Sequence, residues 1–128
     1  MDNWIPFGQG TYAVDRAYIF APDFKALALA QPHIDVHEGQ GGRRSLVGRG
    51  KAANALLVEL LEDHDHLDIV LDLGPPFTFW LKSPDIQAGK VFTPGVVATI
   101  QFVPQGPWQV LSADAFQDLL GRLRRITN

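Results

Sequence analysis

The most regular pattern of apolar and polar residues lies near the C-terminus, where apolar side chains recur every three or four positions. This stripe consists of Phe116, Leu119, Leu120, Leu123 and Ile126. The spacing places its members on one face of an amphipathic helix. Ser112 precedes the stripe as a candidate N-cap, with Asp114 in the first turn. The last turns hold Arg122, Arg124 and Arg125, whose positive charge complements the helix dipole.

A second stripe with the same spacing predicts another helix over Lys51–Asp63. Its members are Ala53, Leu56, Leu57, Leu60 and Leu61. A third, shorter helix is predicted from Pro22 and Asp23 through about Ala30, because proline is favoured in the first turn and aspartate at the positive end of the dipole. Pro32 would end that helix.

Alternating polar and apolar residues, enriched in branched and aromatic types, predict a series of short strands. These are Thr11–Ala21, His33–Glu38, about Arg43–Val47, Leu67–Leu73, Phe77–Leu81, Val96–Val103 and Trp108–Leu111. The glycine-rich stretch Gly39–Gly42 separates two of them and predicts a hairpin turn. Ser83–Lys90 has the composition of a polar loop.

Helices and strands do not alternate strictly, so the pattern favours an α+β fold over a doubly wound parallel sheet. We expect a single domain over residues 1–128, because this length matches one domain. The expected architecture is a mostly antiparallel sheet of about five to seven short strands with two or three helices. The amphipathic C-terminal helix should cover one face of that sheet.

Composition narrows the class of protein further. Hydrophobic residues make up 46% and charged residues 20%, as in ordinary globular proteins. The absence of cysteine excludes disulfides, thiol catalysis and Cys-ligated zinc. The first residues, MDNWIPFGQG, lack the basic start and apolar core of a signal peptide. No apolar run approaches the ~20 residues that cross a bilayer. We therefore expect a cytoplasmic protein that has no membrane partner.

Charge is distributed unevenly along the chain, although the net charge is only -3. The glycine-rich segment Gly39–Lys51 carries four cations, which are Arg43, Arg44, Arg49 and Lys51. These are the candidate contacts for an anion or a nucleic acid. The stretch from Glu59 to Asp72 that follows contains acidic residues and no Lys or Arg. The alternative is that the four cations only form surface ion pairs with this acidic stretch.

Two groups of histidines and carboxylates are candidate metal ligands. His33, Asp35 and His37 are spaced by two, so they share one face of a strand. His64 and His66 lie beside Asp63 and Asp65, and imidazole and carboxylate groups bind zinc or manganese. The alternative is that both groups face solvent.

No motif in the chain specifies a chemistry. Ser45, Ser83 and Ser112 lack the context of a nucleophilic serine. The glycines around Arg49 do not match a phosphate-binding loop. We therefore expect no cofactor, and whether the protein is an enzyme stays open, with a non-catalytic role favoured.

One set of motifs comprises Ile5-Pro-Phe-Gly8-Gln-Gly10, Asp15-Arg16, Pro22, Ile34-Asp35, Gly39 and Arg43-Arg44. These motifs are similar to those of the RemA-like regulators of biofilm matrix genes. That family consists of small, oligomeric, DNA-binding proteins. The resemblance implies DNA contacts at Arg16, Arg43 and Arg44.

Together these features predict a non-catalytic binding protein that recognises a macromolecule, another protein in the first instance, by complementary charge. An immunity or inhibitor protein, or a phage-type accessory protein, would fit. Its acidic face would consist of Glu59, Glu62, Asp63 and Asp65. One alternative is a nucleic-acid-binding regulator that uses the basic segment. The other is a metal-dependent hydrolase built on the histidine groups. The oligomeric state stays open.

Overall fold

The computed structural model describes residues 5, 7–63, 66–74, 77–88, 97–106 and 108–126. The strands in this part of the chain are β1 (Gly10–Ala13), β2 (Arg16–Phe20), β3 (Lys25–Ala28), β4 (Ala30–Glu38), β5 (Arg44–Ala53), β6 (Asp68–Asp72), β7 (Thr78–Leu81), β8 (Asp85–Ala88), β9 (Val97–Val103), β10 (Gln109–Val110) and β11 (Arg124–Arg125). The helices are α1 (Asn54–Asp63), α2 (Ala113–Arg122) and the 3-10 helix η1 (Gln40–Gly42).

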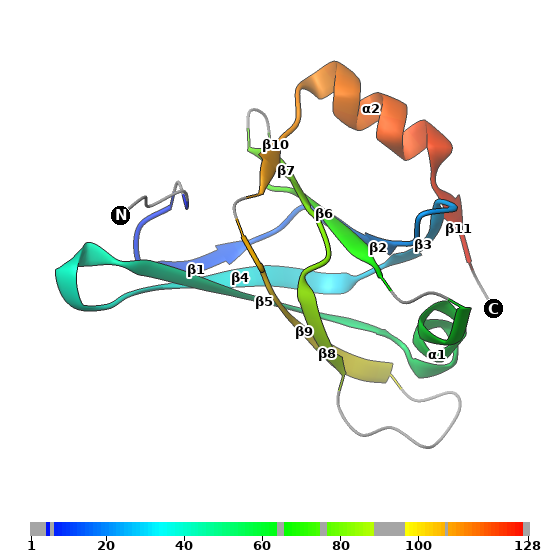
Figure 1. Ribbon diagram of the computed structural model, residues 1–128, viewed down its shortest axis with the longest axis horizontal. Helices are drawn as coiled ribbons and strands as arrows, with labels where there is room; N and C mark the ends of the chain where they lie inside the picture. The colour runs from blue at the N-terminus through cyan, green and yellow to red at the C-terminus, as the bar shows by residue number, and fades with distance from the viewer. Residues whose placement is uncertain are drawn as a thin grey trace.

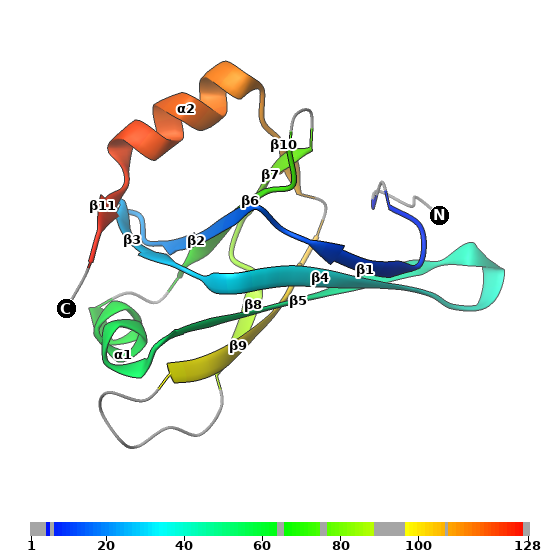
Figure 2. The ribbon, with the colours of Figure 1, turned by 180° about the vertical axis from the view of Figure 1, so that it is seen from behind.

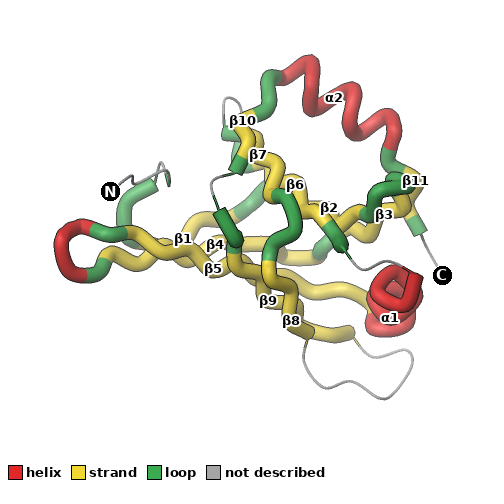
Figure 3. The backbone as a smooth tube through the Cα atoms, viewed as in Figure 1, coloured by secondary structure: helices red, strands yellow, loops and turns green. Residues whose placement is uncertain are grey.

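The strands form two sheets that enclose the main hydrophobic core (Figure 1). The five-stranded sheet has the order β1-β4-β5-β9-β8, and the six-stranded sheet has the order β10-β7-β6-β2-β3-β11. The pairings within the described residues are antiparallel, apart from the parallel pair of β11 and β3. Helix α2 lies over the outside of the six-stranded sheet, and α1 lies at the end of β5 (Figures 1 and 3).

The expected α+β class with one sheet of five to seven strands is wrong, because the described residues are mostly β, with 52% in strands and 20% in helices. The antiparallel pairing was predicted correctly, but it is divided between two sheets. The division begins within the predicted strand Thr11–Ala21. Val14 N–H bonds to Pro32 O at 3.0 Å, and Asp15 N–H bonds to Asp72 O at 2.8 Å. The chain therefore passes from one sheet to the other between these two residues.

The core between the sheets is built from alternate residues of facing strands. Ile34 of β4 and Phe102 of β9 are fully buried from one side, and Ile19 and Ile69 are fully buried from the other. Gly48 lies opposite Phe102 in the β5–β9 register. A Cβ atom at this position would lie 2.0 Å from the nearest atom of the Phe102 ring, so only glycine lets the two strands pack this closely.

An aromatic cluster fills the part of this core nearest the N-terminus. Phe7 lies between Tyr12 and Phe77, with ring centroids 5.0 and 5.5 Å away. Phe79 and Trp108 stack with centroids 4.3 Å apart and planes inclined by 15°. Buried aromatic pairs of this kind add stabilisation beyond the area that they bury.

A second, smaller core joins α2 to the outer face of the six-stranded sheet. Tyr18 and Val70 from the sheet pack with Phe116 and Leu119 from the helix. Ser112 caps the helix, because its Oγ accepts the Ala115 N–H at 3.1 Å. The predicted N-cap and much of the predicted stripe are thus confirmed.

The predicted continuation of this helix to Ile126 is wrong. The helix ends at Arg122, and the segment after it pairs with β3 as the edge strand β11. Arg124 N–H bonds to Phe24 O at 2.7 Å, and Ile126 N–H bonds to Ala26 O at 2.9 Å. These hydrogen bonds to an existing strand edge replace those of a further helical turn.

The predicted helix from Pro22 to Ala30 is also wrong. Phe24 has a positive φ of 68° and donates its N–H to Ala21 O at 2.8 Å, which makes a tight turn. Lys25–Ala28 then forms β3, between β2 and β11. Ala26 and Leu27 are both buried, since the strand is covered on both faces.

Two further boundaries differ from expectation. Helix α1 begins at Asn54 because Lys51, Ala52 and Ala53 still pair with β9. The predicted loop over Ser83–Lys90 contains strand β8, which pairs with β9 at the edge of the five-stranded sheet. Residues 89 and 90, and Val96 at the predicted start of β9, lie outside the described residues.

Candidate functional site

The hairpin of β4 and β5 carries most of the predicted basic segment and extends away from the rest of the fold (Figure 2). Two of its arginines are held by neighbouring groups. Arg44 Nε donates to Glu38 at 3.0 Å, and its Nη1 donates to Ile5 O at 3.0 Å. Arg49 forms an ion pair with Asp35 on β4. The acidic partners thus come from the adjacent strand rather than from the stretch 59–72.

The other two predicted cations, Arg43 and Lys51, are exposed. No ion pair to either of them is found in the part of the chain that the structure describes. Arg43 adjoins the turn, while Lys51 lies near the far end of β5. They are eight positions apart along extended chain, which is roughly 26 Å. Arg43 precedes β5 and the other three lie along it, so the four cations do not converge on one point, although Arg49 and Lys51 line one cavity.

The first predicted metal group lies on the outward face of β4. Ile34 and Val36 are buried, so His33, Asp35 and His37 point away from the core. Asp35 is already occupied, because it accepts the Thr11 hydroxyl at 2.6 Å and pairs with Arg49. This network leaves Asp35 poorly placed to ligate a metal ion.

The second predicted metal group can be followed only in part. His66 is exposed, whereas His64 and Asp65 lie outside the described residues. Among the residues that are described, no three histidine or carboxylate groups converge in a way that could hold a metal ion. The metal interpretation therefore gains no geometric support.

The predicted acidic face lies on α1. Leu57 and Leu60 anchor the helix in the core. Glu59 and Glu62 are exposed on its outer side, and no ion pair to either carboxylate occurs within the described chain. Asp65 and the side chain of Asp63, the other two residues predicted for this face, lie outside the described part.

Two hydrophobic residues of α1 are exposed beside these carboxylates. Val58 is 39% exposed and Leu61 is 44% exposed. Positions three or four apart on a helix are neighbours, so Val58 adjoins Leu61 and Glu62. The outer surface of α1 thus mixes acidic and apolar groups, and we call Val58, Glu59, Leu61 and Glu62 the α1 patch.

The remaining aspartates of the acidic stretch have internal partners. Asp68 accepts the Trp80 indole N–H at 2.9 Å and the Ser83 backbone N–H at 2.9 Å. Asp72 is buried and pairs with Arg16. The block of negative charge seen in the sequence therefore separates into an exposed part on α1 and a structural part on β6.

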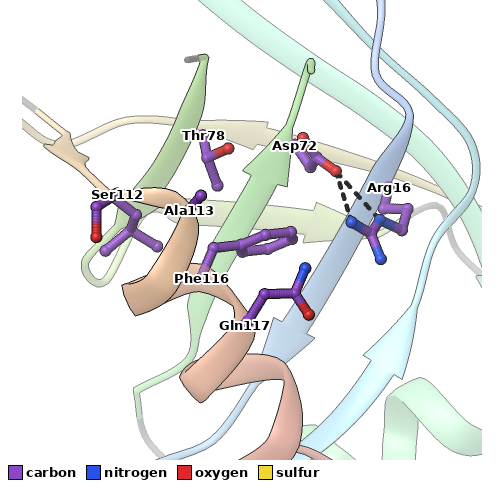
Figure 4. A pocket seen from close by; sticks show the side chains of 8 residues that line it. Arg16, Asp72, Thr78, Ser112, Ala113, Phe116 and Gln117 are labelled. Atoms are coloured by element: carbon purple, nitrogen blue, oxygen red, sulfur yellow. Dashed lines mark hydrogen bonds and ion pairs between the residues drawn. The ribbon is translucent and has the colours of Figure 1, made fainter. Parts of the chain in front are cut away.

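A cavity of about 220 Å³, which the sequence did not predict, lies between the six-stranded sheet and α2 (Figure 4). Asp72 and Thr78, which are opposite each other in the β6–β7 register, line it and are both buried. Arg16 reaches across from β2. Its Nε and Nη2 donate to Asp72 Oδ2 at 3.1 and 2.9 Å. Its guanidinium carbon also lies 5.0 Å from the centre of the Phe116 ring.

The arrangement around this cavity is that of a structural ion pair. The other oxygen of Asp72 accepts the Gly74 N–H at 2.9 Å, so the carboxylate accepts three hydrogen bonds. Ser112, also at the cavity wall, uses its hydroxyl oxygen as the helix cap. The carboxylate and the hydroxyl thus already serve the fold. In the sequence, the only sign of this ion pair is that Arg16 and Asp72 each lie within a predicted strand.

Comparison of the chain with protein-family models, curated proteins and solved structures gives no match. The RemA-like resemblance therefore rests on its motifs alone. Of the three arginines that it implies as DNA contacts, Arg16 and Arg44 are engaged in ion pairs. No helix in the described residues has the length and apolar character needed to cross a membrane.

Proposed function

We propose that the protein is a non-catalytic binding protein that recognises a basic partner protein through the α1 patch. The observation that carries this proposal is the exposure of Val58 and Leu61 beside Glu59 and Glu62. Interfaces between proteins combine apolar contact area with charged groups at their rims. An inhibitor or immunity protein, of bacterial or phage type, is the form of this function that the charge pattern favours.

The two kinds of side chain in the α1 patch would have different roles. Glu59 and Glu62 would attract a basic partner and raise the rate of association. Val58 and Leu61 would lose contact with water on binding. This burial would stabilise the complex by roughly 25 cal/mol for each Å² of apolar surface, and it would slow dissociation.

The geometry supports the alternatives less well. A nucleic-acid contact by the basic hairpin would have to compete with the ion pairs of Arg44 with Glu38 and of Arg49 with Asp35. Its cations are also dispersed along β5. A metal-dependent hydrolase would have to release Asp35 from Thr11 and Arg49.

The test begins with affinity capture from the native host by three proteins: the wild type, Glu62→Lys and Asp85→Lys. Asp85 is an exposed carboxylate on β8, so its reversal makes the same change in net charge away from α1. We expect that the wild type and the Asp85→Lys control retain a partner protein and that Glu62→Lys does not retain it.

Association with that partner is then measured at low and high salt. Glu62→Lys should slow association several-fold at low salt and less at high salt, because salt screens exposed charges. Leu61→Asp should speed dissociation. If all the variants capture the same proteins with the same kinetics, the α1 patch is not the binding surface.

A further inference from the structure

A groove at the end of β5 combines cationic and apolar walls. It consists of two cavities of about 320 and 290 Å³ that adjoin at Lys51, which lines both of them. The larger cavity lies among β3, the start of β4, the end of β5, the start of α1 and the C-terminal segment. The smaller cavity lies on the outward face of β4, β5 and β9. We call the two together the Lys51 groove.

The two cavities differ in polarity. The larger is lined mostly by apolar side chains, among them Leu27, Leu56 and Ile126, and by four alanines whose small side chains leave room. The smaller is lined by polar and cationic groups, with His33, Arg49 and Thr99 beside Lys51. A ligand that spans both would need a polar end and an apolar end.

The charge on the groove is positive. Neither cavity has an aspartate or glutamate among the described residues that line it. Arg125, in the larger cavity, has a neutral partner: it donates to the Tyr18 hydroxyl at 2.7 Å and lies 4.9 Å from the centre of that ring. Lys51 is exposed and has no ion pair in the described chain. Arg49 is offset by its ion pair with Asp35, so the positive charge that would attract an anion is that of Lys51 and Arg125.

We propose that the Lys51 groove binds a single-chain amphiphilic anion, with a carboxylate or phosphate head beside Lys51 and an apolar chain in the larger cavity. The larger cavity has a volume of about 320 Å³ and is open to solvent, which leaves room for a short alkyl chain of about ten carbons. The chain would cover the apolar wall, including Val97, which is 60% exposed. This inference is independent of the α1 patch, because it concerns a different ligand and different residues.

The direct test is calorimetric titration of the full chain with decanoate and with decyl phosphate, both below their micelle concentrations. Saturable binding at one site per chain is expected for at least one of them, and the pair distinguishes a carboxylate from a phosphate head. Inorganic phosphate alone should bind at least tenfold more weakly. Decyltrimethylammonium, which has the same chain and the opposite charge, should show no saturable binding.

Variants separate the contributions of head and chain. Lys51→Glu should weaken decanoate or decyl phosphate binding at least tenfold, whereas Lys82→Glu, an equal change at another exposed lysine, should leave it unchanged. Ala28→Leu should weaken binding by filling the larger cavity, and a thermal melt of each variant checks that it is folded.

Four results would overturn the proposal. The first is the absence of saturable binding by both amphiphiles. The second is equal binding of the cationic amphiphile, which would show that the apolar wall acts alone. The third is unchanged binding by folded Lys51→Glu. The fourth is displacement of the amphiphile by a short DNA duplex, which would assign the groove to nucleic acid.

Discussion

At the scale of single residues, the Arg16–Asp72 pair is asymmetric. The side chain of Arg16 is 44% exposed and that of Asp72 only 9%. When one partner is removed, the cost depends on whether the remaining charge can reach water. An arginine without its aspartate can turn toward solvent, whereas an aspartate without its arginine stays buried against the Gly74 N–H.

Arg16→Met should therefore destabilise the protein more than Asp72→Asn. We expect a loss of roughly 2–3 kcal/mol for Arg16→Met and about 1 kcal/mol for Asp72→Asn, since a buried charge is left unpaired only in the first. Urea unfolding measures both. Arg122→Met is the control, because Arg122 pairs with Asp118 on the exposed surface of α2 and such pairs contribute at most about 0.5 kcal/mol. Equal losses for Arg16→Met and Arg122→Met would contradict this account.

At the scale of elements, the cap of α2 determines how firmly the second core is closed. The Ser112 Oγ satisfies one of the backbone donors that every helix start leaves without a partner. Helix α2 covers Tyr18 and Val70, so its stability is coupled to that of the six-stranded sheet.

Ser112→Ala should lower the free energy of unfolding by about 1 kcal/mol, because the Ala115 N–H loses its acceptor. Ser112→Asp should retain most of the stability, since its carboxylate can accept the same bond and favours the positive end of the helix. Chemical denaturation followed by circular dichroism compares the two variants. If Ser112→Asp is as unstable as Ser112→Ala, the loss has a cause other than capping.

The elements that the sequence predicted well are those with one solvent-exposed face and one buried face. The β4 strand alternates because His33 and Asp35 face solvent while Ile34 is buried, and α2 has a stripe because its other side is exposed. Strand β3 has no such alternation, since neighbours cover both Ala26 and Leu27. The two-sheet architecture did not follow from the alternation of residues, because it depends on where the chain passes from one sheet to the other.

Contacts between distant parts of the chain were not predictable from local patterns. Arg16 and Asp72 are separated by 56 residues, and only the β2–β6 register brings them together. The acidic stretch also shows that a local pattern does not reveal which residues find partners in the fold. Its charges form a block in the sequence. In the fold, however, Asp68 accepts a hydrogen bond and Asp72 forms an ion pair, while Glu59 and Glu62 stay exposed on α1.

At the scale of the whole molecule, β5 connects two regions of opposite character. The basic hairpin turn lies at its start and the acidic helix α1 follows its end (Figure 2). Ion pairs with Glu38 and Asp35 offset two of the hairpin arginines. The uneven charge of the sequence therefore becomes an exposed acidic patch at one end and a partly neutralised basic arm at the other.

A protein with this distribution should bind DNA weakly even at low salt. Each phosphate contact made by a free cation steepens the dependence of affinity on salt, and paired arginines contribute little to that dependence. We expect negligible retention of a short DNA duplex in fluorescence anisotropy at low salt, and any residual binding should fall in Arg43→Ala, which removes an exposed cation. Arg49→Ala leaves Asp35 without its arginine. The unpaired carboxylate should repel the DNA phosphates and so reduce any residual binding. Tight binding with a steep salt slope that falls in Arg43→Ala would instead favour a nucleic-acid regulator and would contradict the assignment of binding to α1.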